Sequence, residues 1–279
     1  IYTLSLHDAL PIWSAMNIKN VVVAGGGVLG SQIAFQSAFC GFNVTIWLRS
    51  EGSIGRTKPK LERLRDIYLN TLEQMKTDKS AYCRGFSDKE DLTIDEIDEL
   101  KECTIKAYDG IKLTTSYEDA AADADLVIEA IAEDPEQKIS FYQELAKHLP
   151  EKTILVTNSS TMLPSSFAKY TGRPEKYLAL HFANSIWSNN TAEIMGHSET
   201  QQKYYDEVVK FAQDINMVPL KLKKEQPGYI LNSMLVPFLS AAEALLANDV
   251  ADHETIDKTW ILATGAPIGP RRPDRKSVV

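Results

Sequence analysis

Short apolar runs rich in β-branched residues alternate along the chain with longer segments whose apolar positions recur at helical spacing. The apolar runs predict strands over residues 21–24, 43–48, 112–115, 126–130, 153–157 and 177–182. Helical spacing predicts helices over 31–40, 60–75 and 136–149, with Pro135 in the first turn of the last. The polar, acidic stretch 77–109 predicts solvated helices and loops. This alternation predicts a Rossmann-like α/β fold, a mostly parallel sheet with helices on both faces.

The pattern changes after the charged linker at 221–225. Pro227 opens a strongly helical region, and its apolar run over 229–246 is typical of a buried helix in a bundle. We therefore expect the sheet to be followed by the start of an all-α C-terminal domain.

Composition and charge exclude several classes of protein. Hydrophobic residues make up 44% of the chain and charged residues 24%, as in ordinary globular proteins. The net charge of −8 argues against nucleic acid or an anionic membrane as a partner. No apolar run approaches the roughly 18 residues of a membrane span. Cys40, Cys83 and Cys103 form no Cys-x-x-Cys pair, so we expect neither disulfides nor a metal site, and a cytoplasmic location.

Both ends carry segments that look foreign to the rest of the chain. Residues 3–12, TLSLHDALPI, resemble the translation of a common sequencing adapter, and residues 274–279, DRKSVV, resemble its reverse complement. Met16 is therefore the expected natural start, and 1–15 and 274–279 are expected to be non-native. We expect the chain to lack most of its C-terminal helices, and therefore to expose apolar helix surface, to aggregate and to be inactive.

A glycine-rich turn follows the first predicted strand. The letters GGGVLG fit the pattern G-x-G-x-x-G directly before a predicted helix. Glycines let the turn close, and they let backbone N–H groups at the helix N-terminus approach a pyrophosphate. The pattern predicts a dinucleotide site at Gly25, Gly27, Val28, Leu29 and Gly30.

The second predicted strand ends without the acidic residue that usually binds the adenosine ribose. Leu48 stands near that position, and Arg49 and Ser50 follow it. An arginine and a hydroxyl suit a 2′-phosphate, which favours NADP with Arg49 as a contact. Glu51 keeps NAD open as the alternative.

Six segments together resemble the 3-hydroxyacyl-CoA dehydrogenase family over residues 16–270: VVVAGGGVLGSQIA, DLVIEAIAEDPEQK, VTNSST, LHFAN, AEIM and QPGYILNSMLVP. The resemblance implies hydride transfer between a short-chain (S)-3-hydroxyacyl-CoA and NAD or NADP. It implies 3-oxoacyl-CoA as the product, and fatty acid or butyrate metabolism as the setting. It also implies a dinucleotide-binding Rossmann domain over 16–223 and a truncated helical domain over 224–273, which in the intact protein would form a homodimer.

The resemblance assigns four residues to the reacting centre: Ser160, His181, Glu193 and Asn232. These residue types suit alcohol oxidation, because histidine exchanges protons near neutral pH and a carboxylate can hold its second ring nitrogen. Ser160 and Asn232 would hydrogen-bond the reacting oxygen of the substrate. Taken singly, each residue is also compatible with a structural role, and their occurrence together with the glycine turn favours catalysis.

The resemblance also implies binding residues around that centre. Glu133, Lys138 and Asn184 match cofactor contacts. Cations on the helix after the second strand match the region that covers the phosphates of coenzyme A; they are Lys58, Lys60, Arg63 and Arg65.

One departure from the family bears on the substrate. The family usually reads HFFNP where this chain reads HFANS at 181–185, which puts the acyl-chain preference in question. An L-gulonate 3-dehydrogenase activity on a free hydroxy acid, and a lambda-crystallin-like protein without that activity, share the fold and the same four residues and stay open as alternatives.

Overall fold

An eight-stranded sheet runs through the computed structural model, which describes residues 17–270. The strand order is β3-β2-β1-β4-β5-β6-β7-β8. β1 to β6 are parallel, β7 is antiparallel to β6, and β8 is parallel to β7. The strands are β1 (Asn20–Ala24), β2 (Asn43–Trp47), β3 (Lys112–Thr114), β4 (Leu126–Glu129), β5 (Ile154–Thr157), β6 (Tyr177–Phe182), β7 (Thr191–Met195) and β8 (Val218–Lys221). This order confirms the predicted Rossmann-like α/β fold.

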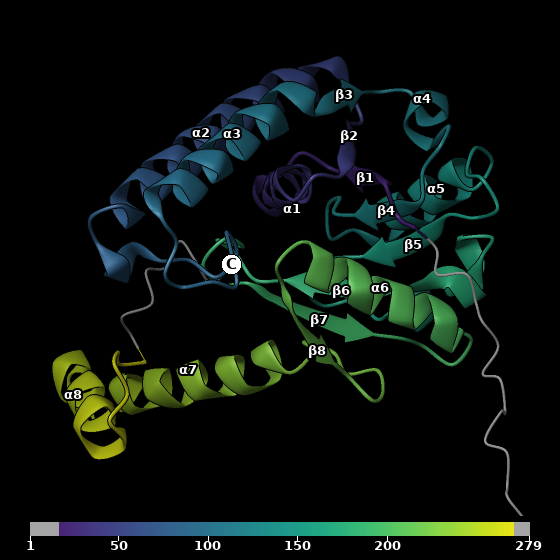
Figure 1. Cartoon of the computed structure of the whole chain (residues 1–279). Coiled ribbons are helices and arrows are strands. Elements are labelled where there is room, and N and C mark those ends of the chain that lie inside the picture. The colour runs from purple at the N-terminus through teal and green to yellow at the C-terminus, as the bar shows by residue number, and fades with distance from the viewer. Residues whose placement is uncertain (1–16, 271–279) are drawn as a thin grey trace, which may run out of the picture.

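Helices cover both faces of the sheet (Figure 1). The helices are α1 (Val28–Phe39), α2 (Glu51–Met75), α3 (Ile94–Gly110), α4 (Tyr117–Ala121), α5 (Pro135–Leu145), α6 (Gln202–Asp214), α7 (Leu231–Ala247) and α8 (His253–Thr264). Short 3-10 turns lie at Lys79–Ala81, Pro164–Ser166, Ala168–Tyr170 and Pro174–Lys176. The foreign segments expected at 1–15 and 274–279 lie outside the described residues.

The two faces are packed by alternate residues of each strand. In β1, Val21 and Val23 pack with α1, α2, α3 and α6, whereas Val22 and Ala24 pack with α4 and α5. Successive side chains of a strand point to opposite faces, so a strand buried on both sides is apolar throughout. This explains why the buried strands were the easiest elements to predict.

The structure differs from the sequence-based expectation in three places. α2 begins at Glu51 rather than near residue 60. Its first turns were not predicted, because they are polar and carry Gly52 and Gly55. α6, β7 and β8 lie in a region where no element was predicted. The expected burial of the helix after Pro227 is wrong for the described residues: α7 forms, but Ala242 is its only buried residue.

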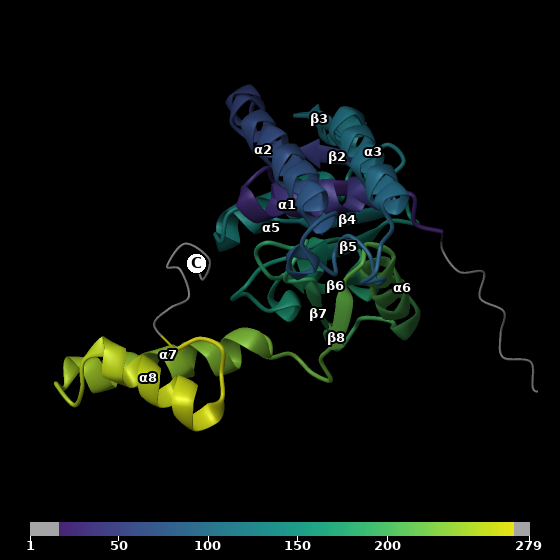
Figure 2. The ribbon, with the colours of Figure 1, turned by 60° about the vertical axis from the view of Figure 1, so that its left-hand side comes forward.

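Figures 1 and 2 show α7 and α8 standing away from the sheet, connected to it through the segment after β8. The carboxyl ends of the parallel strands carry the glycine turn after β1, Ala130 after β4, Asn158 after β5 and His181 in β6. In open α/β sheets this edge binds ligands.

Candidate active site

The glycine turn after β1 is packed from behind and open in front. Gly25 has a φ of 113°, and a Cβ there would lie 2.4 Å from the carbonyl oxygen of Ala130. A Cβ on Gly30 would lie 2.2 Å from the carbonyl oxygen of Gly25. Gly27 precedes the first turn of α1 and faces open space. The turn therefore fits the pyrophosphate of a dinucleotide, which backbone N–H groups at the N-terminus of α1 would bind.

A cavity of about 910 Å³ opens beside this turn, between β2 and α5. Its wall includes the aromatic side chains of Trp47, Tyr117 and Phe141. The ring centroids of Trp47 and Tyr117 lie 4.5 Å apart, and those of Trp47 and Phe141 lie 5.1 Å apart. An aromatic, apolar wall next to the glycine turn fits an adenosine moiety.

The rim of this cavity is basic. Arg49 Nη1 donates to Gln137 Oε1 at 3.0 Å, and Arg56 Nη2 donates to Ser53 Oγ at 2.8 Å. Arg49, Ser53 and Arg56 all line the cavity. Glu51, the acid nearest in sequence, accepts from Thr115 Oγ1 at 3.2 Å. Two guanidinium groups and the hydroxyl of Ser53 thus line the cavity where sequence analysis pointed to Arg49 and the hydroxyl of Ser50.

A second cavity of about 830 Å³ lies on the other side of the turn. Candidate residues from both the nucleotide set and the catalytic set line it; they are Gly27, Val28, Leu29, Gly30, Lys60, Glu133, Ser160 and Asn184. Val28 is 63% exposed toward solvent at the first turn of α1. The fold therefore brings Ser160 and the glycine turn, which are far apart in sequence, to one cavity.

His181 and Glu193 face each other across the antiparallel pair of β6 and β7. They are directly paired in register, and His181 Nδ1 lies 3.0 Å from Glu193 Oε2. The other ring nitrogen of His181, Nε2, lies 3.3 Å from Ser160 Oγ. His181 is 6% exposed and Glu193 is 3% exposed. The three side chains form a line from a buried carboxylate through an imidazole to a hydroxyl that lines the second cavity.

Glu193 is held as a carboxylate. Burial raises its pKa, but hydrogen bonds from His181 and from the backbone N–H groups of Leu231 and Ile230 outweigh burial, so its pKa is lowered. Both N–H groups donate to Glu193 Oε1 at 2.9 Å. The carboxylate can therefore fix the ring orientation and tautomer of His181 while it also anchors the start of α7.

Asn232 lies in the first turn of α7, directly after this anchor. Its backbone N–H donates to the carbonyl oxygen of Gly228 at 3.1 Å. Its side chain makes no hydrogen bond to Ser160 or His181 within residues 17–270, and it does not line either cavity beside the glycine turn. The role of Asn232 at the reacting oxygen stays a prediction.

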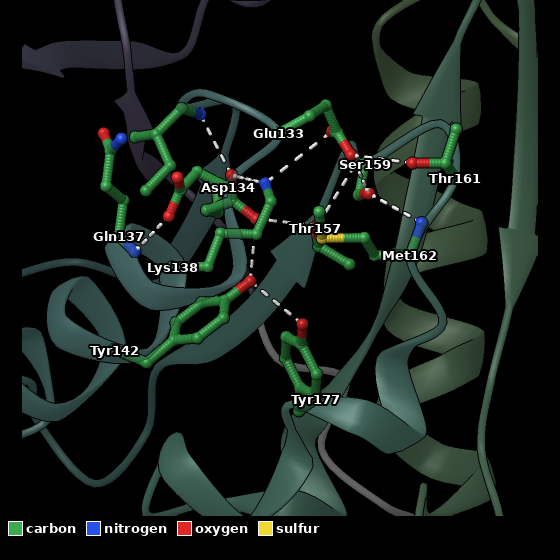
Figure 3. A network of polar contacts seen from close by, with 12 residues as sticks. Glu133, Asp134, Gln137, Lys138, Tyr142, Thr157, Ser159, Thr161, Met162 and Tyr177 are labelled. Carbon is green, nitrogen blue, oxygen red and sulfur yellow. Dashed lines mark hydrogen bonds and ion pairs between the residues drawn. The ribbon is translucent and has the colours of Figure 1, made fainter.

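Glu133 and Lys138 belong to a network of polar contacts that joins the loop after β4 to α5 and to the loop after β5 (Figure 3). Lys138 is 1% exposed, and its Nζ lies 2.6 Å from Glu129 Oε1 and 3.7 Å from Glu133 Oε1. Glu133 Oε2 accepts from Ser159 Oγ at 2.7 Å and from Thr161 Oγ1 at 3.1 Å. Glu133 thus reaches the cavity, whereas Lys138 lies behind it and supports Glu133.

The fully buried carboxylate of Glu129 accepts hydrogen bonds from several donors. Besides Lys138 it accepts from the hydroxyls of Tyr142 at 2.8 Å and Thr157 at 2.7 Å. The backbone N–H of Ile131 donates to it at 2.9 Å. Its partners come from the loop after β4, from α5 and from β5, so the network holds these segments together.

The predicted cations of α2 divide into two groups. Lys60 and Arg63 line the second cavity, and Lys60 Nζ donates to the carbonyl oxygen of Gly26 at 3.0 Å. Lys58 is exposed and lines neither cavity beside the glycine turn, and Arg65 lies over the ring of Tyr108 at 4.6 Å. The fold therefore directs Lys60 and Arg63 toward the candidate site.

Besides Ser53 and Arg56 on the rim of the first cavity, sequence reasoning missed two residues that contact this site. Gln32 Oε1 accepts from the backbone N–H of Ser185 at 2.9 Å, which holds the loop after His181. Tyr229 stacks its ring on His181 with centroids 4.5 Å apart. Neither has a sequence signal of its own, because a glutamine in a helix and a tyrosine before one are common in structural roles.

The described residues contain no group of three or more histidine, cysteine, aspartate or glutamate side chains that could hold a metal ion. Within the same residues, no helix is long and apolar enough to cross a membrane.

Comparison with known proteins gives two family matches. The family model described as the NAD-binding domain of 3-hydroxyacyl-CoA dehydrogenase matches residues 20–226. The model of the C-terminal domain of 3-hydroxyacyl-CoA dehydrogenase matches residues 228–273.

Three similar proteins cover most of the chain. A 3-hydroxybutyryl-CoA dehydrogenase of Clostridioides difficile is 29% identical over 90% of this chain and 79% of its own length. A solved diketoreductase, from work on the dual catalysis of dicarbonyl compounds, is 46% identical with a TM-score of 0.78, over 91% of this chain and 81% of its own. The (S)-3-hydroxybutyryl-CoA dehydrogenase of Ralstonia eutropha is 25% identical with a TM-score of 0.75, over 91% and 80%.

Proposed function

Because the chain belongs to the 3-hydroxyacyl-CoA dehydrogenase family, we propose that it oxidises (S)-3-hydroxyacyl-CoA to 3-oxoacyl-CoA with a nicotinamide dinucleotide, and catalyses the reverse reduction. Fatty acid or butyrate metabolism is the expected setting. The curated relative and the Ralstonia eutropha structure, both 3-hydroxybutyryl-CoA dehydrogenases, support a short acyl chain.

The line from Glu193 through His181 to Ser160 is the observation that carries this proposal. In the oxidative direction, Nε2 of His181 takes the proton of the substrate hydroxyl, while the Nδ1 proton stays hydrogen-bonded to Glu193 Oε2. The buried carboxylate stabilises the imidazolium that forms, and Ser160 Oγ orients the reacting oxygen. In the reductive direction the same nitrogen returns the proton.

The glycine turn and the adjoining cavity would hold the cofactor, with Gly25, Gly27 and Gly30 at the pyrophosphate. When bound, the nicotinamide accepts the hydride from the alcohol or supplies it to the ketone. We propose NADP as the preferred form, supported by Arg49, Ser53 and Arg56 on the rim of the cavity.

A second candidate substrate is a free dicarbonyl compound or hydroxy acid. It is favoured by the 46% identity to the diketoreductase, compared with 25–29% to the two 3-hydroxybutyryl-CoA dehydrogenases. The segment HFANS at 181–185 departs from the family's usual HFFNP, which agrees with a substrate other than the family's usual one. L-gulonate belongs to the same class of free substrate and stays among the alternatives.

We further propose a cytoplasmic enzyme whose intact form is a homodimer through its C-terminal helices. The three free cysteines support a reducing compartment. Exposed apolar side chains on α7 and α8, among them Met234, Trp260 and Leu262, support pairing of these helices with further helical surface.

A substrate panel tests the proposal directly. Initial rates should be measured with 3-hydroxybutyryl-CoA, L-gulonate and a free 1,3-diketone, each with both phosphorylation states of the cofactor. We expect the CoA thioester to give the highest kcat/KM, and NADP to be preferred over NAD. A preference for the free diketone would make that compound the proposed substrate, whereas tight cofactor binding without turnover of any compound would agree both with the inactivity expected of this chain and with the lambda-crystallin-like alternative.

A further inference from the structure

Tyr229 lies at the junction between β8 and α7 and faces the imidazole of His181. The two rings are nearly parallel, with centroids 4.5 Å apart and an interplanar angle of 12°. Tyr229 is 1% exposed and has a φ of 54°, in the left-handed region that non-glycine residues rarely adopt. This strained backbone turns the ring toward His181, and such strain persists only where surrounding contacts hold it.

The hydroxyl of Tyr229 reaches the other side of the same site. It donates to the carbonyl oxygen of Ser159 at 2.7 Å, directly before Ser160, whose Oγ lies 3.3 Å from His181 Nε2. Burial raises the pKa of Tyr229, so its hydroxyl stays protonated and can donate near neutral pH.

The two residues after Tyr229 contact Glu193, the carboxylate that pairs with His181. The N–H groups of Ile230 and Leu231 both donate to Glu193 Oε1 at 2.9 Å. Three consecutive residues at the start of the C-terminal helices therefore contact His181, the peptide before Ser160, and Glu193.

We propose that Tyr229 is a positioning residue of the acid–base site, whose ring stabilises the imidazolium of His181 and whose hydroxyl fixes the position of Ser160. This inference rests on the proposed acid–base role of His181. An aromatic face stacked on a cation lowers its energy, so the ring favours the form of His181 that has taken up the substrate proton. The hydroxyl satisfies a buried carbonyl, which would otherwise be left without this donor and allow the loop after β5 to shift.

The competing explanation is that Tyr229 only fills the small core that it forms with Ala179 and Met195. That role needs an aromatic ring but no hydroxyl. Tyr229→Phe keeps the ring and removes the hydroxyl, and Tyr229→Leu removes both. Tyr82→Phe is the matched control, because the Tyr82 hydroxyl also donates to a backbone carbonyl at 2.7 Å, that of Ser87, away from this site.

Two measurements on the full chain test the proposal without requiring turnover. In proton NMR spectra, the ring protons of His181 should be shifted upfield by the stacked ring in the wild type and in Tyr229→Phe, and lose this shift in Tyr229→Leu. Amide hydrogen exchange in residues 158–162 should speed up about tenfold in Tyr229→Phe and not in Tyr82→Phe. If Tyr229→Leu fails to fold, hydrogen exchange in the wild type, Tyr229→Phe and Tyr82→Phe still decides the role of the hydroxyl.

The kinetic readout then separates positioning from packing. We expect Tyr229→Phe to lower kcat about 5- to 20-fold with little change in KM, and Tyr229→Leu to lower it further and to displace the acidic limb of the pH profile of kcat/KM toward lower pH. A Tyr229→Phe variant with wild-type exchange and wild-type kcat would overturn the proposal. Absence of turnover in the wild type would agree with the inactivity expected from the sequence, and the NMR and exchange data would still decide the role of Tyr229.

Discussion

The sheet domain and the α7–α8 pair are both rich in apolar residues, but they use them differently. In α1, buried residues run almost the whole length of the helix, from Gly30 to Phe39, whereas α7 buries only Ala242 and α8 only Ile256. The segment just before α7 is the exception, because Tyr229 is buried against His181. Most of the buried apolar surface therefore lies in the sheet domain, whereas the α7–α8 pair is connected to the site through the segment just before α7.

The largest expected effect lies in the sheet domain, at the buried pair of Lys138 and Glu129. Lys138→Met would leave the Glu129 carboxylate without its cation in a site that is 0% exposed. We expect the free energy of unfolding, measured by urea denaturation, to fall by about 3–5 kcal/mol.

The exposed pair of Lys147 and Glu144 is the matched control, with the same 2.6 Å separation. Lys147→Met should leave the urea midpoint unchanged, because exposed pairs contribute little. Equal losses in the two variants would contradict the view that burial gives the Glu129 pair its importance.

Two side-chain truncations should differ in their cost to stability, one in the sheet domain and one in α7. Ile128→Ala, in β4 at 0% exposure, should lower the free energy of unfolding by about 3 kcal/mol through the lost contacts and the cavity left behind. Leu245→Ala, in α7 at 44% exposure, should change it by less than about 0.5 kcal/mol. If the α7 variant were as destabilised as the β4 variant, α7 would have to be packed against other surface in solution.

Acid should weaken the connection between the two regions at Glu193. The pKa of Glu193 is lowered in the folded protein, so its carboxylate contributes stability that is fully present above the ordinary value of 4.5 and is lost as the pH falls through the lowered value. The urea midpoint of the wild type should therefore exceed that of Glu193→Gln near neutral pH, and the difference should shrink below about pH 4.

Glu199→Gln, on the exposed turn after β7, is the control for this titration. Its urea midpoint should follow that of the wild type at every pH. A difference between wild type and Glu193→Gln that grows on acidification would have the opposite sign to this account.

The smallest effect on stability is expected on the exposed faces of α7 and α8. Met234 is 63% exposed and Leu262 is 72% exposed. Replacing both with glutamine should reduce light scattering from concentrated solutions, with a change in the free energy of unfolding below about 0.5 kcal/mol. Scattering that is already absent in the wild type would show that these faces do not drive self-association.

Much of the sheet domain could be predicted because its strands are buried on both faces and its glycine turn has few alternatives. β1, β4, β5 and β6 appear as continuous apolar runs, and Gly25 and Gly30 are required by backbone contacts that the pattern G-x-G-x-x-G encodes. β8 was not predicted because it is a short edge strand that contains Pro219, and edge strands are only weakly marked in sequence.

The candidate site could be predicted only where the type of a single residue indicates its chemical role. The register of β6 and β7, which places His181 opposite Glu193, depends on long-range pairing that no local pattern specifies. The burial of Lys138 behind Glu133, and the stacking of Tyr229, depend in the same way on tertiary packing. The apolar run after Pro227 predicts a helix that other surface covers. It does not specify which surface covers it, and the expected burial was therefore wrong for the described residues.

Replacing His181 with asparagine tests the central claim, that His181 between Glu193 and Ser160 moves the substrate proton. The substrate should be the one that gives the highest kcat/KM with the wild type. We predict that kcat falls by at least about 10²-fold, while the dissociation constant of the cofactor changes by less than about twofold. A His181→Asn variant that keeps more than about a tenth of the wild-type kcat would contradict the account.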